Sequence, residues 1–158
     1  MSEAELVDAA NRRLEALFPG LTAFVAQRRV EAAARVAAFW ANVRPERRRL
    51  RAAPERPVVF DLDPLVEYAG EIGALVEWRF VHDSLDFADV APSLRALTGR
   101  ELLVVPHCED CLRTTVDAVL AAADLRVAGA DVLFIGMSAP EVVVVQHDGW
   151  LGVLRGSG

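Results

Sequence analysis

The hydrophobic positions in the first third of the chain recur at helical spacing. Ser2 and Glu5 have the spacing of a capping box, and one apolar face follows until Pro19-Gly20 interrupts it, which predicts a first helix. A second helix is predicted from about Thr22 to Val43. Its apolar stripe comprises Ala26, Val30, Ala33, Ala37 and Trp40. We expect the two helices to form an antiparallel hairpin or to lie across a sheet.

After Pro57 the pattern changes to short apolar runs that alternate with helical segments. Strands are predicted at 58–62, 77–82, 101–105, 131–136, 141–146 and 150–156. Helices are predicted at 63–76, 88–98 and 110–124. Asp63 is the expected N-cap of the first of these helices, with Pro64 at its first helical position. Asp148-Gly149 predicts a tight hairpin turn between the last two strands.

These elements predict an α+β protein, because the helices come first and the strands are concentrated later in the chain. Residues 1–56 would be a helical N-terminal segment that packs on the main domain. Residues 57–158 would form that domain, with a mixed β-sheet, flanking helices and a C-terminal β-hairpin. The whole chain of 158 residues is 53% hydrophobic, which is enough for one core without disulfides. We therefore expect one compact unit.

No apolar run approaches the roughly 20 residues of a membrane-spanning helix, and the amphipathic N-terminus does not resemble a signal peptide. We therefore expect a soluble, cytoplasmic protein that does not engage membranes.

The net charge of −6 is unevenly distributed along the chain. Residues 1–56 carry 11 arginines and 7 acidic residues, whereas residues 57–158 carry 6 arginines and 16 acidic residues. This acidic body disfavours nucleic-acid binding and favours docking to a basic protein partner. Six arginines fall between Arg44 and Arg56, where they form either a solvated linker or an anion-binding patch.

The two cysteines of the chain, Cys108 and Cys111, form a CxxC motif after a predicted strand. In a cytosolic protein this spacing indicates metal binding, catalysis or redox exchange, although buried cysteines also serve as small apolar residues. A helix start would lower the pKa of the first thiol, whereas Glu109 and Asp110 oppose its ionisation. Cys108 would attack a substrate disulfide and Cys111 would resolve the mixed disulfide.

Residues 77–156 resemble the thioredoxin-like superfamily, in which a strand leads into CxxC and a later proline precedes a β-hairpin. In this chain the strand is ELLVV, the motif is Cys108 to Cys111 and the proline is Pro140. The resemblance implies a thiol–disulfide protein in which a cis peptide bond before Pro140 faces the cysteines. The segment between Cys111 and Pro140 lacks room for the family's middle helix.

A zinc site is the third possibility for this motif. His107, Cys108 and Cys111 are three zinc-competent residues within five positions, and His147 or His82 would supply a fourth ligand. Such a site would make the chain a zinc-stabilised binding domain. No other cofactor is expected.

The chain lacks a nucleophile elbow, a phosphate-binding glycine-rich loop and a recognisable Ser/His/Asp triad. We therefore favour a small acidic binding protein, immunity- or regulator-like, over an enzyme. If the chain is an enzyme, the cysteine pair predicts a thiol–disulfide oxidoreductase.

Overall fold

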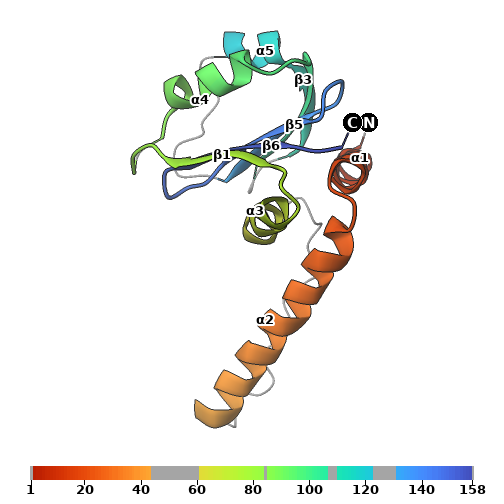
Figure 1. The fold of residues 1–158 in the computed structure, drawn as a ribbon, viewed down its shortest axis with the longest axis vertical. Coiled ribbons are helices and arrows are strands. Elements are labelled where there is room, and N and C mark those ends of the chain that lie inside the picture. The colour runs from red at the N-terminus through yellow and green to blue at the C-terminus, as the bar shows by residue number, and fades with distance from the viewer. Residues whose placement is uncertain (1, 44–60, 84, 107–109, 123–130, 158) are drawn as a thin grey trace.

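The computed structural model describes residues 2–43, 61–83, 85–106, 110–122 and 131–157, without the side chains of residues 39–43. Its helices are α1 (Glu3–Leu17), α2 (Leu21–Val43), α3 (Leu62–Glu71), α4 (Phe87–Arg95) and α5 (Val116–Ala121). Its strands are β1 (Leu75–Phe80), β2 (Glu101–Pro106), β3 (Leu112–Thr115), β4 (Val132–Gly136), β5 (Glu141–Val145) and β6 (Trp150–Arg155). Figure 1 shows these elements along the chain.

The strands form one sheet in the order β1-β6-β5-β4-β2-β3. Every pair of neighbouring strands in it is antiparallel. The α+β class and the C-terminal hairpin are confirmed, but the sheet is antiparallel throughout rather than mixed. The last strand, β6, lies between β5 and β1, so β1 and β3 are the two edge strands.

Helices cover both faces of the sheet, because successive strand residues point to opposite sides. In β2, Leu103 and Val105 belong to the core with α1 and α3, whereas Leu102 and Val104 belong to the core with α4 and α5. The same alternation holds along β4 and β5, whose residues are all buried. Figure 1 shows α3 on one side of the sheet and α4 and α5 on the other.

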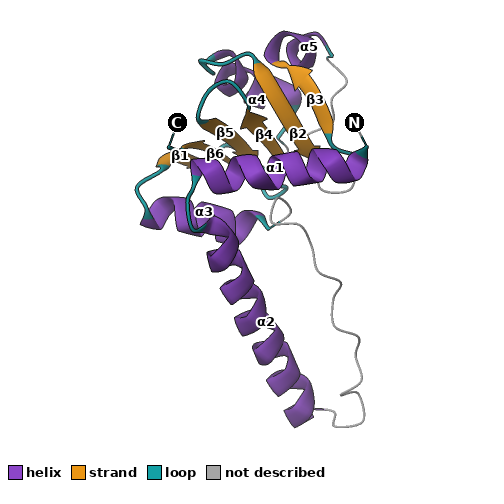
Figure 2. Cartoon of the chain, turned by 90° about the vertical axis from the view of Figure 1, so that its right-hand side faces the viewer, coloured by secondary structure: helices purple, strands orange, loops and turns teal. Residues whose placement is uncertain are grey.

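Helix α1 lies along one face of the sheet (Figure 2). The Ser2 side chain accepts a hydrogen bond from the Glu5 backbone N–H at 3.2 Å, as the sequence predicts. Arg13 donates to the carbonyl oxygens of Gly136 and Ala139, at 2.8 and 3.0 Å, and thereby joins α1 to the β4–β5 turn.

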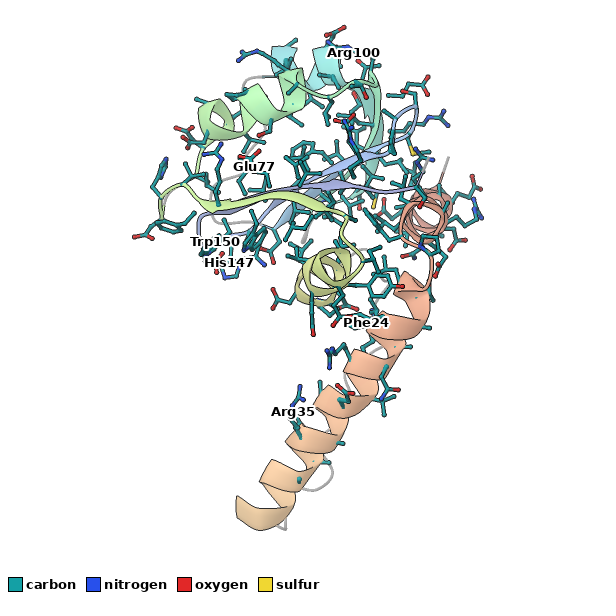
Figure 3. The ribbon with its side chains drawn as sticks, viewed as in Figure 1. Phe24, Arg35, Glu77, Arg100, His147 and Trp150 are labelled. Carbon is teal, nitrogen blue, oxygen red and sulfur yellow. The ribbon has the colours of Figure 1, made fainter. Side chains whose placement is uncertain are left out.

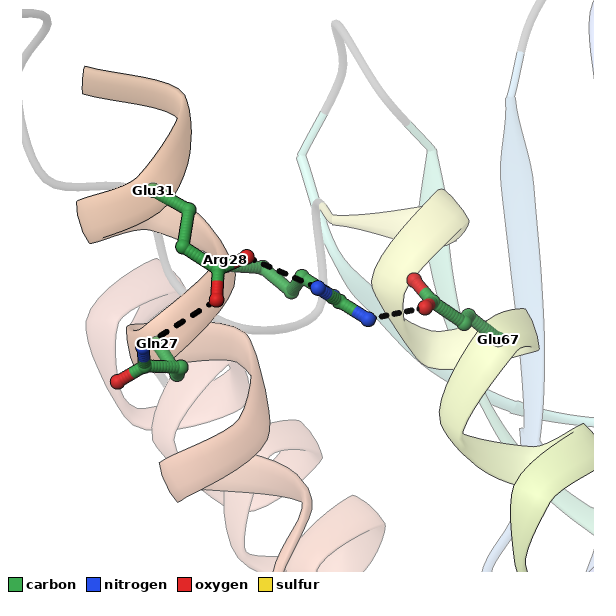
Figure 4. Close-up of polar contacts among 4 residues, drawn as sticks. All are labelled: Gln27, Arg28, Glu31 and Glu67. Atoms are coloured by element: carbon green, nitrogen blue, oxygen red, sulfur yellow. Dashed lines mark hydrogen bonds and ion pairs between the residues drawn. The ribbon is translucent and has the colours of Figure 1, made fainter. Parts of the chain in front are cut away.

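Helix α2 packs on α3 only through its first turns and then extends away from the body (Figures 1 and 2). Leu21 and Val25 are fully buried, and Arg28 forms ion pairs with Glu31 and with Glu67 of α3 (Figure 4). The expected apolar stripe does not cover the sheet. Its described members are solvent-exposed, and Val30 is 66% exposed.

Two local predictions are wrong, and a third is tested only at its last two residues. Helix α3 begins at Leu62 with Asp61 as its N-cap, so Asp63 lies in the first turn. Residues 112–115, expected to be helical, form the edge strand β3, and α5 begins only at Val116. The reason lies in Thr115, whose side chain accepts from the Ala118 backbone N–H at 3.1 Å and caps α5. The strand expected at 58–62 falls mostly on residues outside the described ranges; its last residue, Leu62, is the first of α3.

Candidate functional site

The strand order brings many carboxylates to one end of the sheet. At this end β1, β2 and β5 finish, and β3, β4 and β6 begin. We call it the acidic end, and its carboxylates are Asp63, Asp83, Asp86, Asp89, Asp110, Asp131 and Asp148. The described connecting residues here, 81–83, 85–86, 110–111, 131 and 146–149, contain no arginine. Seven of the 16 acidic residues of the segment 57–158 therefore lie at this one end of the sheet.

His147 is tied to Asp131 at the acidic end. Asp131 Oδ1 accepts the backbone N–H of His147 at 2.8 Å and lies 2.9 Å from its Nδ1. This contact raises the pKa of His147, and the charges of Asp148 and Asp63 add to the effect. Gln146 donates to Asp63 at 2.9 Å, which joins the β5–β6 hairpin to the start of α3.

A second histidine–aspartate pair lies beside this hairpin. His82 Nε2 is 2.8 Å from Asp89, which forms a capping box with Asp86 at the start of α4. The backbone N–H of Asp86 and then the charge of His82 lower the pKa of Asp89. Gly149 permits the close approach of the hairpin, because its φ is +99° and a Cβ would lie 2.3 Å from the His82 carbonyl oxygen.

Three aromatic side chains border the acidic end. Trp78 and Trp150 stack with ring centroids 5.3 Å apart, and Phe80 meets Trp150 edge-on at 5.7 Å. We call these three residues the aromatic ladder. Phe80 is 50% exposed, on the edge strand β1. Figure 3 labels Trp150 and His147 near this edge of the sheet.

Cys111 lies just before β3, in a setting that disfavours the thiolate. The side chain is 6% exposed, and burial raises the pKa of its thiol to about 12, with further contributions from Glu3 and Asp110. Glu3 also accepts the backbone N–H of Cys111. The expectation that Cys111 sits within the first turns of a helix is wrong, because β3 follows it.

The remaining candidate residues do not form one cluster in the described part of the chain. His107 and Cys108 lie outside the described residues. Pro140 lies in the β4–β5 turn, at the opposite end of the sheet from Cys111, and no cis peptide bond occurs among the described residues. His147 follows β5 and Cys111 precedes β3, so about three strand spacings, roughly 14 Å, separate them.

No group of three or more His, Cys, Asp or Glu residues suited to a metal occurs in the described part of the chain. None of the described helices has the length and apolarity to cross a membrane. The chain matches no protein-family model, and neither a curated protein nor a solved structure is significantly similar to it.

The sequence analysis missed the aromatic ladder and the role of Asp131. Strand alternation places Trp78 and Phe80 on one face, and this signal was present in the sequence. The contacts of Trp78 and Phe80 with Trp150 depend on the pairing of β1 with β6, in which Phe80 lies opposite Trp150. Local patterns do not encode that pairing.

Proposed function

We propose that this chain is a non-enzymatic binding protein that docks a basic protein partner through the acidic end and the adjoining aromatic ladder. Carboxylates accelerate the encounter with a basic surface and fix its orientation. Aromatic side chains supply contact area at the centre of an interface, where charged residues are depleted. An immunity- or regulator-like protein works through such a surface without performing chemistry.

The observation that carries the proposal is the adjacency of the ladder and the carboxylates. Trp150 begins β6 directly after the turn that holds Asp148, and Phe80 ends β1 shortly before Asp83. Asp83 and Asp148 are both exposed. A half-exposed aromatic ring beside a carboxylate rim matches the core-and-rim pattern of protein interfaces.

Affinity capture with matched charge variants tests this proposal. The acidic-end variant carries Asp83→Asn, Asp110→Asn and Asp148→Asn, three exposed positions. The control variant carries Glu71→Gln, Glu101→Gln and Asp117→Asn, which are exposed near the other end of the sheet. Both variants change the net charge equally. Captured proteins are identified by mass spectrometry, and the affinity of each pair is then measured by calorimetry.

We expect a basic partner that binds the wild type and the control alike and loses affinity for the acidic-end variant. Its binding should weaken with added salt, because exposed charges are screened beyond about 10 Å at 0.1 M. Phe80→Ala should cost about tenfold or more in affinity if the ladder is central. Equal binding to both charge variants, or no partner at low salt, would refute the proposal.

The two alternative functions depend on Cys108, which lies outside the described residues. A thiol–disulfide protein would use Cys108 and Cys111. A zinc-stabilised binding domain would use both with His107, but not with His147, which lies about three strand spacings from Cys111. Native mass spectrometry separates them from the binder. A gain of two hydrogens on reduction supports the first alternative, and a chelator-sensitive zinc adduct supports the second.

A further inference from the structure

The outer edge of β1 carries backbone groups that pair with no other strand in the described part of the chain. Val81 donates its backbone N–H to the Gly149 carbonyl oxygen at 2.9 Å, toward the β6 side. The direction of these groups alternates along an antiparallel pair, so those of Arg79 also face β6. The N–H and C=O groups of Trp78 and Phe80 therefore point away from the sheet. Such a row of unpaired groups is a template for another strand.

The side chains of β1 leave this edge open. The Trp78 ring stacks on Trp150 of β6, and a Cβ at Gly152 would lie 2.7 Å from it, so the ring leans over β6 and away from the edge. Helix α3 lies on one face of the sheet and α4 on the other (Figure 1). Val76 and Phe80 on this strand are 65% and 50% exposed. An added strand can therefore approach β1 and would cover apolar surface.

The sequence of β1 is complementary to its own reverse. Residues 75–81 read LVEWRFV, and reversal about Trp78 exchanges Glu77 with Arg79. It also exchanges Val76 with Phe80, both apolar. Charged residues on an edge strand normally discourage pairing with other chains. Here their order favours one particular partner, which is a second β1 running in the opposite direction.

We propose that β1 pairs with the β1 of a second copy of this chain, antiparallel and about a twofold axis at Trp78, so that two sheets join into one. The outward backbone groups of the two Trp78 residues then exchange both hydrogen bonds. Glu77 lies opposite Arg79 of the second copy in a non-hydrogen-bonded pair, where side chains approach most closely. A twofold interface needs such a self-complementary patch. The bulge of β1, between Leu75 and Glu77, lies outside this central triplet.

Charge selects this register and direction over the others. Glu77 and Arg79 form an ion pair on one face of β1, and the proposed pairing sets two such pairs beside each other with opposite charges across the strands. A parallel pair in register would put Glu77 against Glu77. An antiparallel pair about Phe80 would put Glu77 opposite Asp83 of the second copy. Like charges directly opposite each other are destabilising.

The dimer goes beyond the proposed binding function and does not depend on it. Strand β1 finishes at the acidic end, so antiparallel pairing places the two acidic ends at opposite ends of the joined sheet. Each copy keeps its own acidic end open, and the dimer presents two of them.

Light scattering coupled to gel filtration, over a range of concentrations, tests the dimer. We expect a mass of twice 17.2 kDa for the wild type. Glu77→Arg sets like charges opposite each other at two places and should weaken the dimer roughly tenfold, as should Arg79→Glu. Glu101→Arg makes the same change of charge as Glu77→Arg at an exposed position of β2, which is paired on both sides, and should dimerise like the wild type. Circular dichroism verifies folding of each variant.

A mixture of the two weakened variants tests whether the charges act between copies. Glu77→Arg carries two basic residues on β1 and Arg79→Glu carries two acidic ones, so the mixture should form a mixed dimer more tightly than either variant alone. A double variant with both changes exchanges the charges and should dimerise like the wild type. A mixture that gains nothing would overturn the proposal, and so would a wild type that stays monomeric at every accessible concentration.

Hydrogen exchange locates the interface within the wild-type dimer. The backbone N–H of Trp78 should gain protection as the protein concentration rises, because only the second copy supplies its acceptor. The N–H of Arg79 faces β6 and should be protected at every concentration. A dimer in which the Trp78 amide exchanges as fast as in the monomer would have its interface elsewhere, and the proposal would be wrong.

Discussion

The backbone N–H of Cys111 donates to both carboxylate oxygens of Glu3, at 2.9 and 3.1 Å. This contact joins the first turn of α1 to the residue before β3, although 108 positions separate them in the sequence. It also holds a negative charge beside a buried thiol. The same carboxylate therefore fixes an edge of the sheet and suppresses ionisation of Cys111.

Replacing Glu3 should lower the pKa of Cys111 without making the thiol reactive at neutral pH. Glu3→Gln keeps an oxygen acceptor and removes the charge, but burial is the larger cause of the raised pKa and remains. We expect a value below about 12 and still above the ordinary 9.0. Alkylation rates of Cys111 against pH, measured in a Cys108→Ser background, provide the readout. Glu5→Gln, on an exposed residue of the same helix, serves as the control.

The raised pKa of Cys111 also makes the stability of the fold depend on pH in the alkaline range. A thiol that ionises less readily in the folded state stabilises the fold below the unfolded pKa, and this contribution is lost as pH rises. The free energy of unfolding should therefore fall between pH 9.0 and about 12 by a smaller amount in Glu3→Gln than in the wild type. Identical alkaline profiles would show that Glu3 does not act on the thiol.

Asp131→Asn should lower the pKa of His147 toward its ordinary 6.5. The asparagine oxygen can still accept the backbone N–H of His147, so the change removes charge more than structure. A raised histidine pKa stabilises the fold below the unfolded value. The wild type should thus exceed the variant in stability mainly below pH 6.5, and the difference should vanish as pH rises through the folded pKa.

NMR titration of the His147 ring protons measures the shift directly. Asp117→Asn, on the exposed first turn of α5, removes an equal charge and should leave the titration unchanged. An unaltered His147 pKa in Asp131→Asn would contradict the assigned cause.

Local sequence patterns predicted most elements of the fold but not how they meet. The alternation in β2, β4 and β5, the Ser2 cap and the Asp148-Gly149 turn each act over a few residues, and the structure confirms them. The sequence analysis missed β3 because its residues run directly into the helical pattern of α5. The boundary between this strand and the helix is the N-cap residue Thr115. The acidic end depends on strand order, which pairs segments distant in sequence.

The stacked position of Trp78 in the aromatic ladder requires a residue without a side chain at position 152, and a pair of glycine substitutions tests this requirement. Gly152 faces Trp78 across β6 and β1, and a Cβ there would lie 2.7 Å from the indole ring. Gly152→Ala should destabilise the fold by about 1–3 kcal/mol through overpacking. Gly70 lies on α3, where a Cβ would meet only the Leu75 side chain at 3.9 Å, so Gly70→Ala should instead stabilise the fold by about 0.5–1 kcal/mol. Denaturant unfolding measures both, and a neutral Gly152→Ala would count against the stacked geometry.

Arg13 should stabilise the packing of α1 on the sheet through its hydrogen bonds to the β4–β5 turn. Its guanidinium donates to the carbonyl oxygens of Gly136 and Ala139, two buried residues around the β4–β5 turn. Arg13→Met keeps the aliphatic stem but leaves these acceptors without the charged donor, which should cost about 1–3 kcal/mol of unfolding free energy. Arg12→Met makes the same change at the exposed neighbouring position and should cost less than about 0.5 kcal/mol.

Hydrogen exchange distinguishes this role of Arg13 from a general loss of stability. If Arg13 fastens the helix, amides of α1 should lose protection in Arg13→Met more than those of α4, which packs on the opposite face of the sheet. Equal loss of protection in both helices would mean that Arg13 contributes only to global stability. Unchanged stability would mean that water replaces the guanidinium at both carbonyl oxygens without cost.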